Sequence, residues 1–386
     1  MYSILQKGIN FFMVEIVEVK TKKQQKAFVN FQMELYKGNK YFVPPILADE
    51  MAIFDKKKNA NFEECDTCYY LAYKDGKLAG RIAGILQKAS NKKDNHKYVR
   101  FSRVDFINDQ EVAKALFDAV EKWAKEQGME YVHGPLGFND LEREGLLIEG
   151  FDQLSCFEEN YTYDYYPKLI EACGYGKDID WLEYRIKVPK QVDEKIKRVS
   201  GKIAQKYGFK LVHAKSTTEI LKKYRNQIFD LLNICYSPLY GVVPITPKME
   251  EQLVSQFRLV VDKKFIAMVT NEQDELIGFG LVFPSIAEAM QASKGKIVST
   301  KIFKLLNAIK HPKVVDTVFI AVRPDYRAKG VPAFIMNEII TNLIELGVEE
   351  AESLLQLETN VNIRNTFGDF EKVQHKRRRC YIKKLD

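Results

Sequence analysis

Apolar and polar residues recur along the first half of the chain with the periods of strands and helices. Val14–Thr21 alternates apolar and polar residues and predicts a strand, and Lys23–Leu35 carries apolar residues at helical spacing. The pattern then predicts a hairpin over Tyr69–Leu86, a strand over Arg100–Ile107 and an amphipathic helix over Glu111–Gln127. The first half therefore reads strand, helix, hairpin, strand, helix.

A related order returns in the second half after ValProLysGlnValAspGlu at 188–194, which is a candidate linker. Thr217 or Thr218 is expected to cap the first long helix of this half. The other predicted elements are two helical segments before a strand at Phe209–Ala214, a helix from Thr246, a hairpin over Phe265–Phe283, a strand at Val314–Val322, a helix at Ala333–Leu346, a strand at Ala351–Leu357, a short helix from Ile363 to Phe370 and a last strand at Arg377–Leu385. We expect a mixed-sheet α/β fold with two tandem domains, 14–190 and 195–386.

Four glycines at 134, 137, 145 and 150 predict an ordered irregular loop within the first domain. Tyrosines follow it at 161, 163, 165 and 166. In one interpretation, the glycines only form the turns of a connecting loop. In the other, the segment forms one wall of an apolar acceptor cleft, since convergent aromatics suit an apolar ligand. Both interpretations stay open.

The segment Val314–Glu349 combines a β-branched strand, a short basic loop and an amphipathic helix. Its loop reads Arg327-Ala-Lys-Gly330-Val-Pro332. Backbone N–H groups at a helix N-terminus, together with the helix dipole, hold anions, and Arg327 and Lys329 add full charges. A diphosphate suits such a loop, and a turn decorated with solvated basic residues is the alternative. The corresponding loop of the first half, 108–110, is AsnAspGln and has neither glycine nor a basic residue.

Composition narrows the class of protein. With 386 residues and a net charge of +7, the chain suits two domains and polyanionic small molecules, and its dispersed basic residues do not indicate a nucleic-acid partner. Cys65 and Cys68 form a C-x-x-C pair without a second pair or suitably spaced histidines, so we expect no metal and reduced cysteines. No segment has spanning length, and Met1 or Met13 fits as the start, so we expect a cytoplasmic protein.

An insertion from Ser285 to His311 is rich in lysine and contains an apolar helix, Ile302–Ile309. It is either a plain surface helix or a lid or patch that contacts a membrane peripherally.

The strand, basic loop and helix resemble the acyl-CoA-binding signature of the GNAT acyltransferase superfamily, with Pro332 as a departure that removes one backbone donor. Two such units in tandem, the GlyProLeuGlyPheAsn and GlyLeuLeuIleGluGlyPheAsp segments and the ending LysArgArgArg-x-Tyr resemble the tandem-GNAT group that includes bacterial ceramide-synthase-like proteins. The resemblance implies acyl-CoA or acetyl-CoA as co-substrate and a first domain that has lost its CoA loop. It places the cofactor contacts at Val322, Arg327, Ala328, Lys329, Gly330, Val331, Ala333 and Asn360.

The resemblance also suggests catalytic residues. Where the pattern has a tyrosine that protonates the departing thiolate, this sequence has Phe367, so Tyr240, Tyr326 or solvent is expected to replace it. Glu358 is the candidate general base, and a salt bridge to one of Arg377–Arg379 is its alternative role.

The expected function is an N-acyltransferase that moves an acyl group from acyl-CoA to an amine, in the ceramide-like case a long-chain amine. The alternatives are an acetyl-CoA-dependent enzyme acting on a small amine, a non-catalytic CoA sensor and a transfer-RNA-dependent aminoacyl transferase. The sequence leaves open the acceptor, the acyl length and the oligomeric state.

Overall fold

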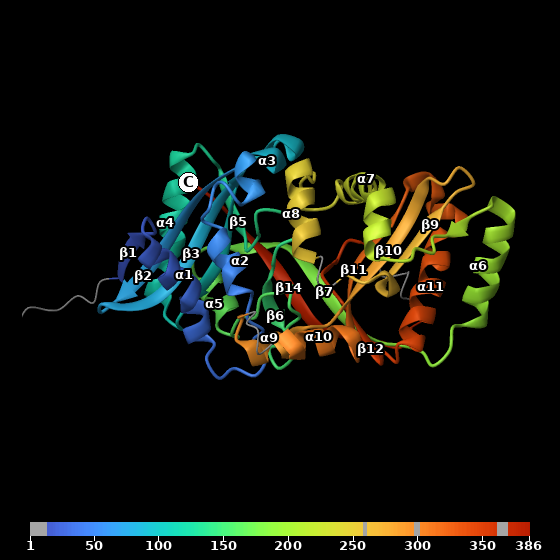
Figure 1. The fold of residues 1–386 in the computed structure, drawn as a ribbon. Helices are drawn as coiled ribbons and strands as arrows, with labels where there is room; N and C mark the ends of the chain where they lie inside the picture. The colour runs from blue at the N-terminus through green and yellow to red at the C-terminus, as the bar shows by residue number, and fades with distance from the viewer. Residues whose placement is uncertain (1–13, 258–260, 297–301, 361–369) are drawn as a thin grey trace, which may run out of the picture.

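One sheet of fourteen strands runs through both halves of the chain in the computed structural model, which describes residues 14–257, 261–296, 302–360 and 370–386 (Figure 1). Twelve of the strands follow the order β1-β2-β3-β4-β5-β14-β7-β12-β11-β10-β9-β8, and β6 and β13 pair beside this path with β14 and β7. The two halves lie side by side along this sheet, as expected for two tandem α/β units (Figure 1).

The first half contains strands β1 to β5. Neighbours from β1 to β4 are antiparallel, whereas β4 and β5 are parallel and are connected through α4. The elements are β1 (Val14–Glu18), α1 (Lys22–Leu35), α2 (Leu47–Ala52), η1 (Ala60–Glu63), β2 (Cys65–Lys74), β3 (Lys77–Gln87), α3 (Lys88–Asp94), β4 (Tyr98–Phe106), α4 (Gln110–Glu126) and β5 (Tyr131–Gly134). Every strand and helix predicted over 14–127 is confirmed.

The second half repeats this arrangement with β8 to β12. Here β8 to β11 are antiparallel neighbours, and β11 and β12 are parallel and connected through α11. The elements are α6 (Glu194–Tyr207), β8 (Lys210–Leu211), α7 (Thr217–Tyr236), α8 (Pro247–Phe257), η2 (Lys263–Phe265), β9 (Ile266–Thr270), β10 (Leu276–Pro284), α9 (Ala287–Ser293), α10 (Ile302–Lys310), β11 (Val314–Val322), η3 (Pro324–Lys329), α11 (Val331–Glu345), β12 (Glu350–Ser353) and β13 (Gln356–Leu357).

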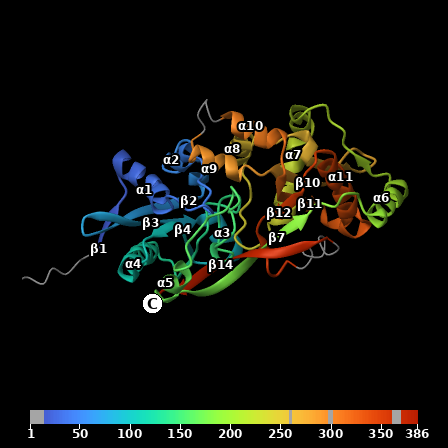
Figure 2. The ribbon, with the colours of Figure 1, turned by 90° about the horizontal axis from the view of Figure 1, so that it is seen from below.

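Two long strands exchange places at the centre of the sheet. Strand β7 (Gly176–Lys187) follows α5 (Tyr166–Glu171) of the first half but pairs with β12 of the second half. Strand β14 (Lys372–Lys384) ends the chain but pairs with β5 and with β7 (Figure 2). This exchange joins the two halves into one continuous sheet.

Several local predictions are wrong. The loop over 134–152 contains strand β6 (Leu146–Glu149), which pairs with β14. Ser216, and neither Thr217 nor Thr218, caps α7 through its side chain, which accepts from the backbone N–H of Glu219. One helix, α6, precedes β8, and the strand expected over 351–357 is split into β12 and β13. The helix expected from Ile363 to Phe370 falls largely outside the described residues.

Helix α11 packs closely on β10. Its buried residues Phe334, Ile335, Ile339, Ile340 and Leu343 include most of the predicted apolar stripe. A Cβ atom on Gly280 would lie 2.6 Å from Ile335 and from Ile339, so only glycine allows this approach. This contact sets the position of the loop before α11.

A buried network of charged side chains crosses the exchanged strands. Lys376 of β14 lies 2.7 Å from Glu183 of β7 and 2.5 Å from Glu352 of β12, measured from Nζ to carboxylate oxygens. Arg378 pairs with Glu183 at 2.6 Å and with Glu159 at 3.1 Å. Although burial opposes ionisation, these cations lower the pKa of Glu183 and of Glu352. The network ties together three strands that are distant in sequence.

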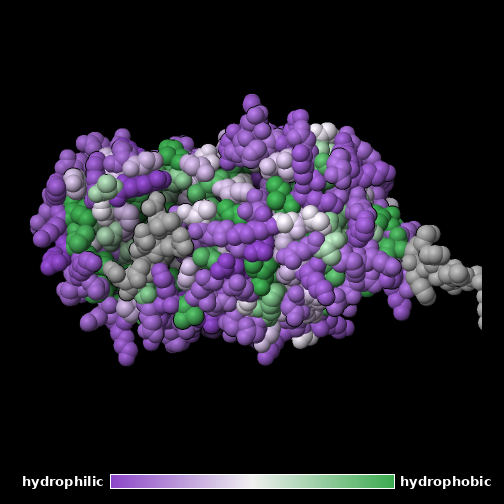
Figure 3. Space-filling view, turned by 180° about the vertical axis from the view of Figure 1, so that it is seen from behind, coloured by the Kyte–Doolittle hydropathy of each residue, from purple (hydrophilic) through white to green (hydrophobic). Residues whose placement is uncertain are grey.

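The surface opposite the view of Figure 1 is mostly hydrophilic, with separate apolar areas (Figure 3). In the described part of the chain, no helix combines the length and apolar composition needed to cross a bilayer.

Candidate active site

The predicted anion loop lies where the sequence placed it. It consists of η3 and the N-terminus of α11, joined at Gly330, which has a φ of 81°. Arg327 and Ala328 are exposed, and Arg327 has no ion-pair partner among the residues that the structure describes. Its Nε donates to the carbonyl oxygen of Val322 at 3.2 Å, and the guanidinium also lies beside the thiol of Cys235.

The space beside Gly330 is occupied by another part of the chain. A Cβ atom there would lie 2.1 Å from Cδ1 of Ile203 on α6, the helix that follows the linker. On this side, Gly330 therefore allows close approach of α6. Lys329 lies over the ring of Tyr326 at 4.1 Å, and Tyr326 packs against Phe209. A substitution at Gly330 would therefore disturb packing as well as any ligand.

The first half has no comparable loop. Asp109 caps α4 and accepts hydrogen bonds from the backbone N–H groups of Glu111 and Val112, and Lys74 pairs with Asp109. These amides are therefore already bonded to a carboxylate of the chain.

Strands β11 and β12 separate close to the loop. Their parallel pairing runs from Val314 opposite Glu350 to Thr317 opposite Ser353, whereas β11 continues to Val322. An irregularity in the pairing of β10 with β11 falls at the same level, between Leu281 and Val282. The backbone of β11 beyond Thr317 therefore lacks β12 as a neighbour on this side.

Tyr240 lies in a compact polar cluster with β5, β7 and β14. Its hydroxyl donates to Oδ2 of Asp178 at 2.5 Å and lies 2.9 Å from Nδ1 of His133 and 3.2 Å from Sγ of Cys380. Burial, Cys380 and Asp178 raise the pKa of this hydroxyl, which keeps it protonated. The three partners have ligand atoms close enough to share a metal ion, but the hydroxyl already contacts each of them.

Glu358 and Asn360 follow β13. The Glu358 carboxylate lies 2.7 Å from Nζ of Lys177 and accepts from the backbone N–H of Asp180 at 3.2 Å. Glu358 therefore forms a salt bridge with Lys177, and the ion pairs of the described residues include none between Glu358 and Arg377–Arg379. Asn360 donates its backbone N–H to Leu357, and Phe367 lies outside the described residues.

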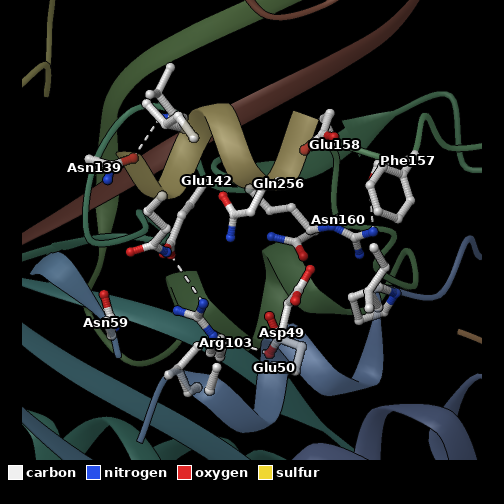
Figure 4. A pocket seen from close by; sticks show the side chains of 18 of the residues that line it. Asp49, Glu50, Asn59, Arg103, Asn139, Glu142, Phe157, Glu158, Asn160 and Gln256 are labelled. Atoms are coloured by element: carbon white, nitrogen blue, oxygen red, sulfur yellow. Dashed lines mark hydrogen bonds and ion pairs between the residues drawn. The ribbon is translucent and has the colours of Figure 1, made fainter. Parts of the chain in front are cut away.

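A polar chamber of about 270 Å³ lies between the two halves (Figure 4). Its walls come from α2 and the segments 139–143 and 157–160 on one side, and from α8, α9, α10 and β11 on the other. Arg103, at its floor, pairs with Glu50 at 3.2 Å and with Glu142 at 3.1 Å. Arg81, Arg143 and Lys58 also line the chamber, so it contains several cations besides Arg103 together with several further carboxyl groups.

Three carboxyl groups of the polar chamber have no ion-pair partner in the described ranges: Asp49, Glu158 and Asp316. Burial raises the pKa of Glu158 to about 7, against the opposing charge of Arg143. Partial burial and the adjacent Glu50 raise the pKa of Asp49. A cation that entered the chamber would lower these pKa values and be bound in return.

Asp316 is the carboxyl group nearest the opening between β11 and β12. It is 4% exposed, and its Oδ1 has no hydrogen-bond partner in the part of the chain that the structure describes. Burial, Glu352 directly opposite on β12, and Glu159 raise its pKa well above the ordinary value. The sequence analysis missed this residue, although a single acid within the apolar run VVDTVFIAV was visible.

A second, apolar cavity of about 690 Å³ lies between α7, α8 and the sheet. Ile228, Phe229, Leu281 and Phe319 are among its lining residues. The apolar cavity and the polar chamber share Leu141, Leu253 and Phe283 as walls. Phe283 also pairs in register with Asp316, so the acid lies at the junction of the two spaces.

Comparison with known proteins finds two relatives that are similar to this chain over nearly its whole length. No family model matches the chain. The chain is 26% identical over 373 residues to Protein YghO of Escherichia coli K12, covering 94% of each. It is 23% identical over 389 residues to a protein of Caulobacter vibrioides named bacterial ceramide synthase, covering 96% of this chain and 98% of that protein.

Solved structures share the fold at lower identity. A tandem GNAT protein from the clavulanic acid biosynthesis pathway superposes with a TM-score of 0.55 at 10% identity, over 97% of this chain and 99% of that one. The GCN5-related glucosamine N-acetyltransferase region of a fungal multi-domain β-N-acetylglucosaminidase gives 0.57 at 10% identity, over 97% of this chain and 38% of that one. The chain therefore has the tandem GNAT fold, and over nearly its whole length it is similar to a protein named bacterial ceramide synthase.

Proposed function

We propose that the protein is an acyl-CoA-dependent N-acyltransferase whose acceptor is a long-chain amine. The observation that carries this proposal is the junction at Asp316, where an apolar cavity of about 690 Å³ meets an acid-lined polar chamber. The apolar cavity lies within the size range of small-molecule sites and offers few polar groups. The relative named bacterial ceramide synthase favours the same substrate class.

The donor would occupy the second half. Arg327, Lys329 and the backbone N–H groups at the start of α11 would bind the phosphates of CoA. The pantetheine arm would run along the opening between β11 and β12, and the acyl chain would enter the apolar cavity past Phe319. Backbone N–H groups of β11 beyond Thr317 would polarise the thioester carbonyl, except that of Ile320, which donates to the Tyr236 hydroxyl at 3.2 Å.

The acceptor amine would enter the polar chamber as an ammonium ion. Glu158 and Asp49 would attract its charge, since neither forms an ion pair in the described chain and Arg143 only partly offsets the charge of Glu158. Asp316 would take the proton, and the nitrogen would then attack the thioester carbon. As the C–N bond forms, the nitrogen loses its second proton to solvent; the C–S bond breaks, and CoA leaves as a thiolate that takes a proton from solvent. We assign the base role to Asp316 rather than to Glu358, which pairs with Lys177 and does not line the chamber.

Replacing Arg327 by alanine should weaken CoA binding about 10- to 100-fold, because a hydrogen bond between charged partners contributes about 1.5–3 kcal/mol. The measurement is the CoA concentration dependence of the melting temperature. Lys125→Ala, which removes an exposed charge from α4 in the other half, is the matched control and should bind CoA normally. Equal affinity of R327A and the wild type would remove this loop from the donor site. Gly330 is unsuitable for this test, because a side chain there would collide with Ile203.

The pH dependence of kcat/KM follows from the raised pKa of Asp316. The base must be ionised, so activity should rise with pH through the raised pKa, well above the range of an ordinary aspartate. An acidic limb of the profile at the pKa of an exposed carboxyl group would argue against Asp316 as the base.

Thermal stabilisation by CoA, acetyl-CoA and palmitoyl-CoA tests the proposed donor. A ligand at 100 times its dissociation constant adds about 2.7 kcal/mol of stability, which shifts the melting temperature measurably. We expect stabilisation by all three and the largest shift with palmitoyl-CoA. A preference for acetyl-CoA would favour a small-amine acetyltransferase. If none of the three ligands shifts the melting temperature, the remaining alternatives are transfer-RNA-dependent aminoacyl transfer and a role that does not involve CoA.

A further inference from the structure

Helix α10 carries an unusual pair of exposed apolar side chains. Phe303 is 74% exposed and Leu306 is 46% exposed, and three residues of separation place them on the same side of the helix. On the opposite side, Leu305 is buried and lines the polar chamber. The described chain has no second helix with two large apolar residues exposed in this way. Solvent exposure of two such residues together indicates a surface that contacts something apolar.

The surroundings of this pair are basic. The sequence from 285 to 313 contains six lysines and one acidic residue, Glu288. Lys294, Lys296, Lys304 and Lys310 are exposed, and none of them has an ion-pair partner among the described residues. Apolar side chains flanked by unpaired lysines are complementary to an anionic lipid surface, where the rings enter the interface and the lysines meet the headgroups.

The same helices are fixed to the rim of the polar chamber. Met290 and Ile286 near α9 and Leu305 of α10 pack around Val43 of the first half. Gln291 donates to the backbone carbonyls of Lys40 and Phe42, at 2.8 and 3.0 Å. Figure 2 shows α9 and α10 beside α2 and α8, which also line the chamber. A membrane bound at α10 would therefore lie at the chamber, where an amine anchored in lipid could reach it.

We propose that α10, through Phe303, Leu306 and the flanking Lys294, Lys296, Lys304 and Lys310, docks the protein on an anionic lipid bilayer. The docking requires only these side chains on the surface, so it does not depend on the proposed acyl transfer. The docking would place the protein at the membrane surface, which the proposed acyl transfer alone does not specify.

Vesicle co-sedimentation tests the docking without any substrate of the proposed reaction. The wild type should sediment with phosphatidylcholine vesicles that contain phosphatidylserine, and less with phosphatidylcholine alone or at high salt. The double variant F303S/L306S should bind vesicles at least about ten-fold more weakly, because it lacks the two apolar side chains that the bilayer would bury. Each of K304A and K310A should weaken binding about five-fold, corresponding to about 1 kcal/mol per lysine.

Ile234→Ser is the matched control, since Ile234 on α7 is 52% exposed and far from the basic cluster in sequence. It should bind vesicles like the wild type. Equal sedimentation of F303S/L306S and the wild type, or no sedimentation of the wild type with either vesicle, would overturn the docking. A dimer of the wild type that F303S/L306S converts to a monomer, without vesicle binding, would show that a second copy covers this surface instead.

Discussion

Replacing Asp316 by asparagine should lower kcat about 10²- to 10⁴-fold, the range that general acid–base catalysis contributes. Asparagine keeps the size of the side chain but cannot accept the proton of the attacking ammonium ion. The loss should appear in kcat at saturating acyl-CoA, because Asp316 does not belong to the loop proposed to bind CoA. Steady-state kinetics with an acyl-CoA and a long-chain amine provide the measurement.

Glu358→Gln is the comparison variant for D316N. It removes a carboxylate that pairs with Lys177 outside the chamber, so its kcat should stay within a few-fold of the wild type. If E358Q abolishes turnover and D316N does not, the base expected from the sequence is correct and our assignment is wrong.

Stability separates the catalytic effect of D316N from misfolding. The pKa of Asp316 is raised in the folded state, so this group favours folding while it is protonated, and that contribution is lost as pH rises through the raised pKa. D316N is neutral at every pH. Its melting temperature should therefore exceed that of the wild type at alkaline pH and match it at acidic pH. A variant that is less stable at alkaline pH would show that Asp316 serves the fold as an anion.

Filling the apolar cavity should change the acyl-length preference. Leu281 of β10 lines this cavity and is only partly buried, so Leu281→Trp would place an indole ring where the acyl chain is proposed to lie. Displacing about four methylene groups at about 0.8 kcal/mol each should lower kcat/KM for palmitoyl-CoA about 100-fold. Activity with acetyl-CoA should change little, because its acyl group does not reach this depth.

Leu281→Met keeps the volume of the side chain and serves as the control, with wild-type preference expected. The ratio of kcat/KM for palmitoyl-CoA and acetyl-CoA is compared among the three proteins. An equal fall in kcat/KM with both donors would indicate a general packing defect. No fall in kcat/KM with either donor would show that the acyl chain of palmitoyl-CoA does not lie in this cavity.

The sequence predicted the local elements well because each has a clear period or a clear stop. Val314–Val322 was predicted with the bounds that the structure has, since a β-branched run there is closed by Pro324. The helix after the basic loop and the amphipathic helix of the first half were also predicted correctly. These signals depend only on neighbours within a few residues.

The exchange of β7 and β14 could not be predicted in the same way. Strand periodicity shows which side of a strand is buried, but it does not select a partner that lies far away in the sequence. Lys376 and Arg378 illustrate this, because the acids beside them, Glu183 and Glu159, lie about 200 residues earlier in the sequence. The register across the exchanged strands brings these charges together into a buried network.

The candidate site was predicted in part. The loop around Arg327 is an exposed helix N-terminus, as the sequence indicated, whereas the packing of Ile203 of α6 beside Gly330 could not be predicted from the sequence. Asp316 was missed because its importance depends on burial, on Glu352 across the sheet and on a chamber built from both halves. Only the assembled fold brings these features together.

The most direct measurement of the proposed function is mass-spectrometric detection of an amide after incubation of the purified protein with palmitoyl-CoA and a long-chain primary amine. Acyl transfer predicts the N-palmitoyl amide and one equivalent of free CoA per amide, with product formation lost in D316N. Hydrolysis of palmitoyl-CoA without amide, or no release of CoA across a panel of long- and short-chain amines, would contradict N-acyl transfer by this protein.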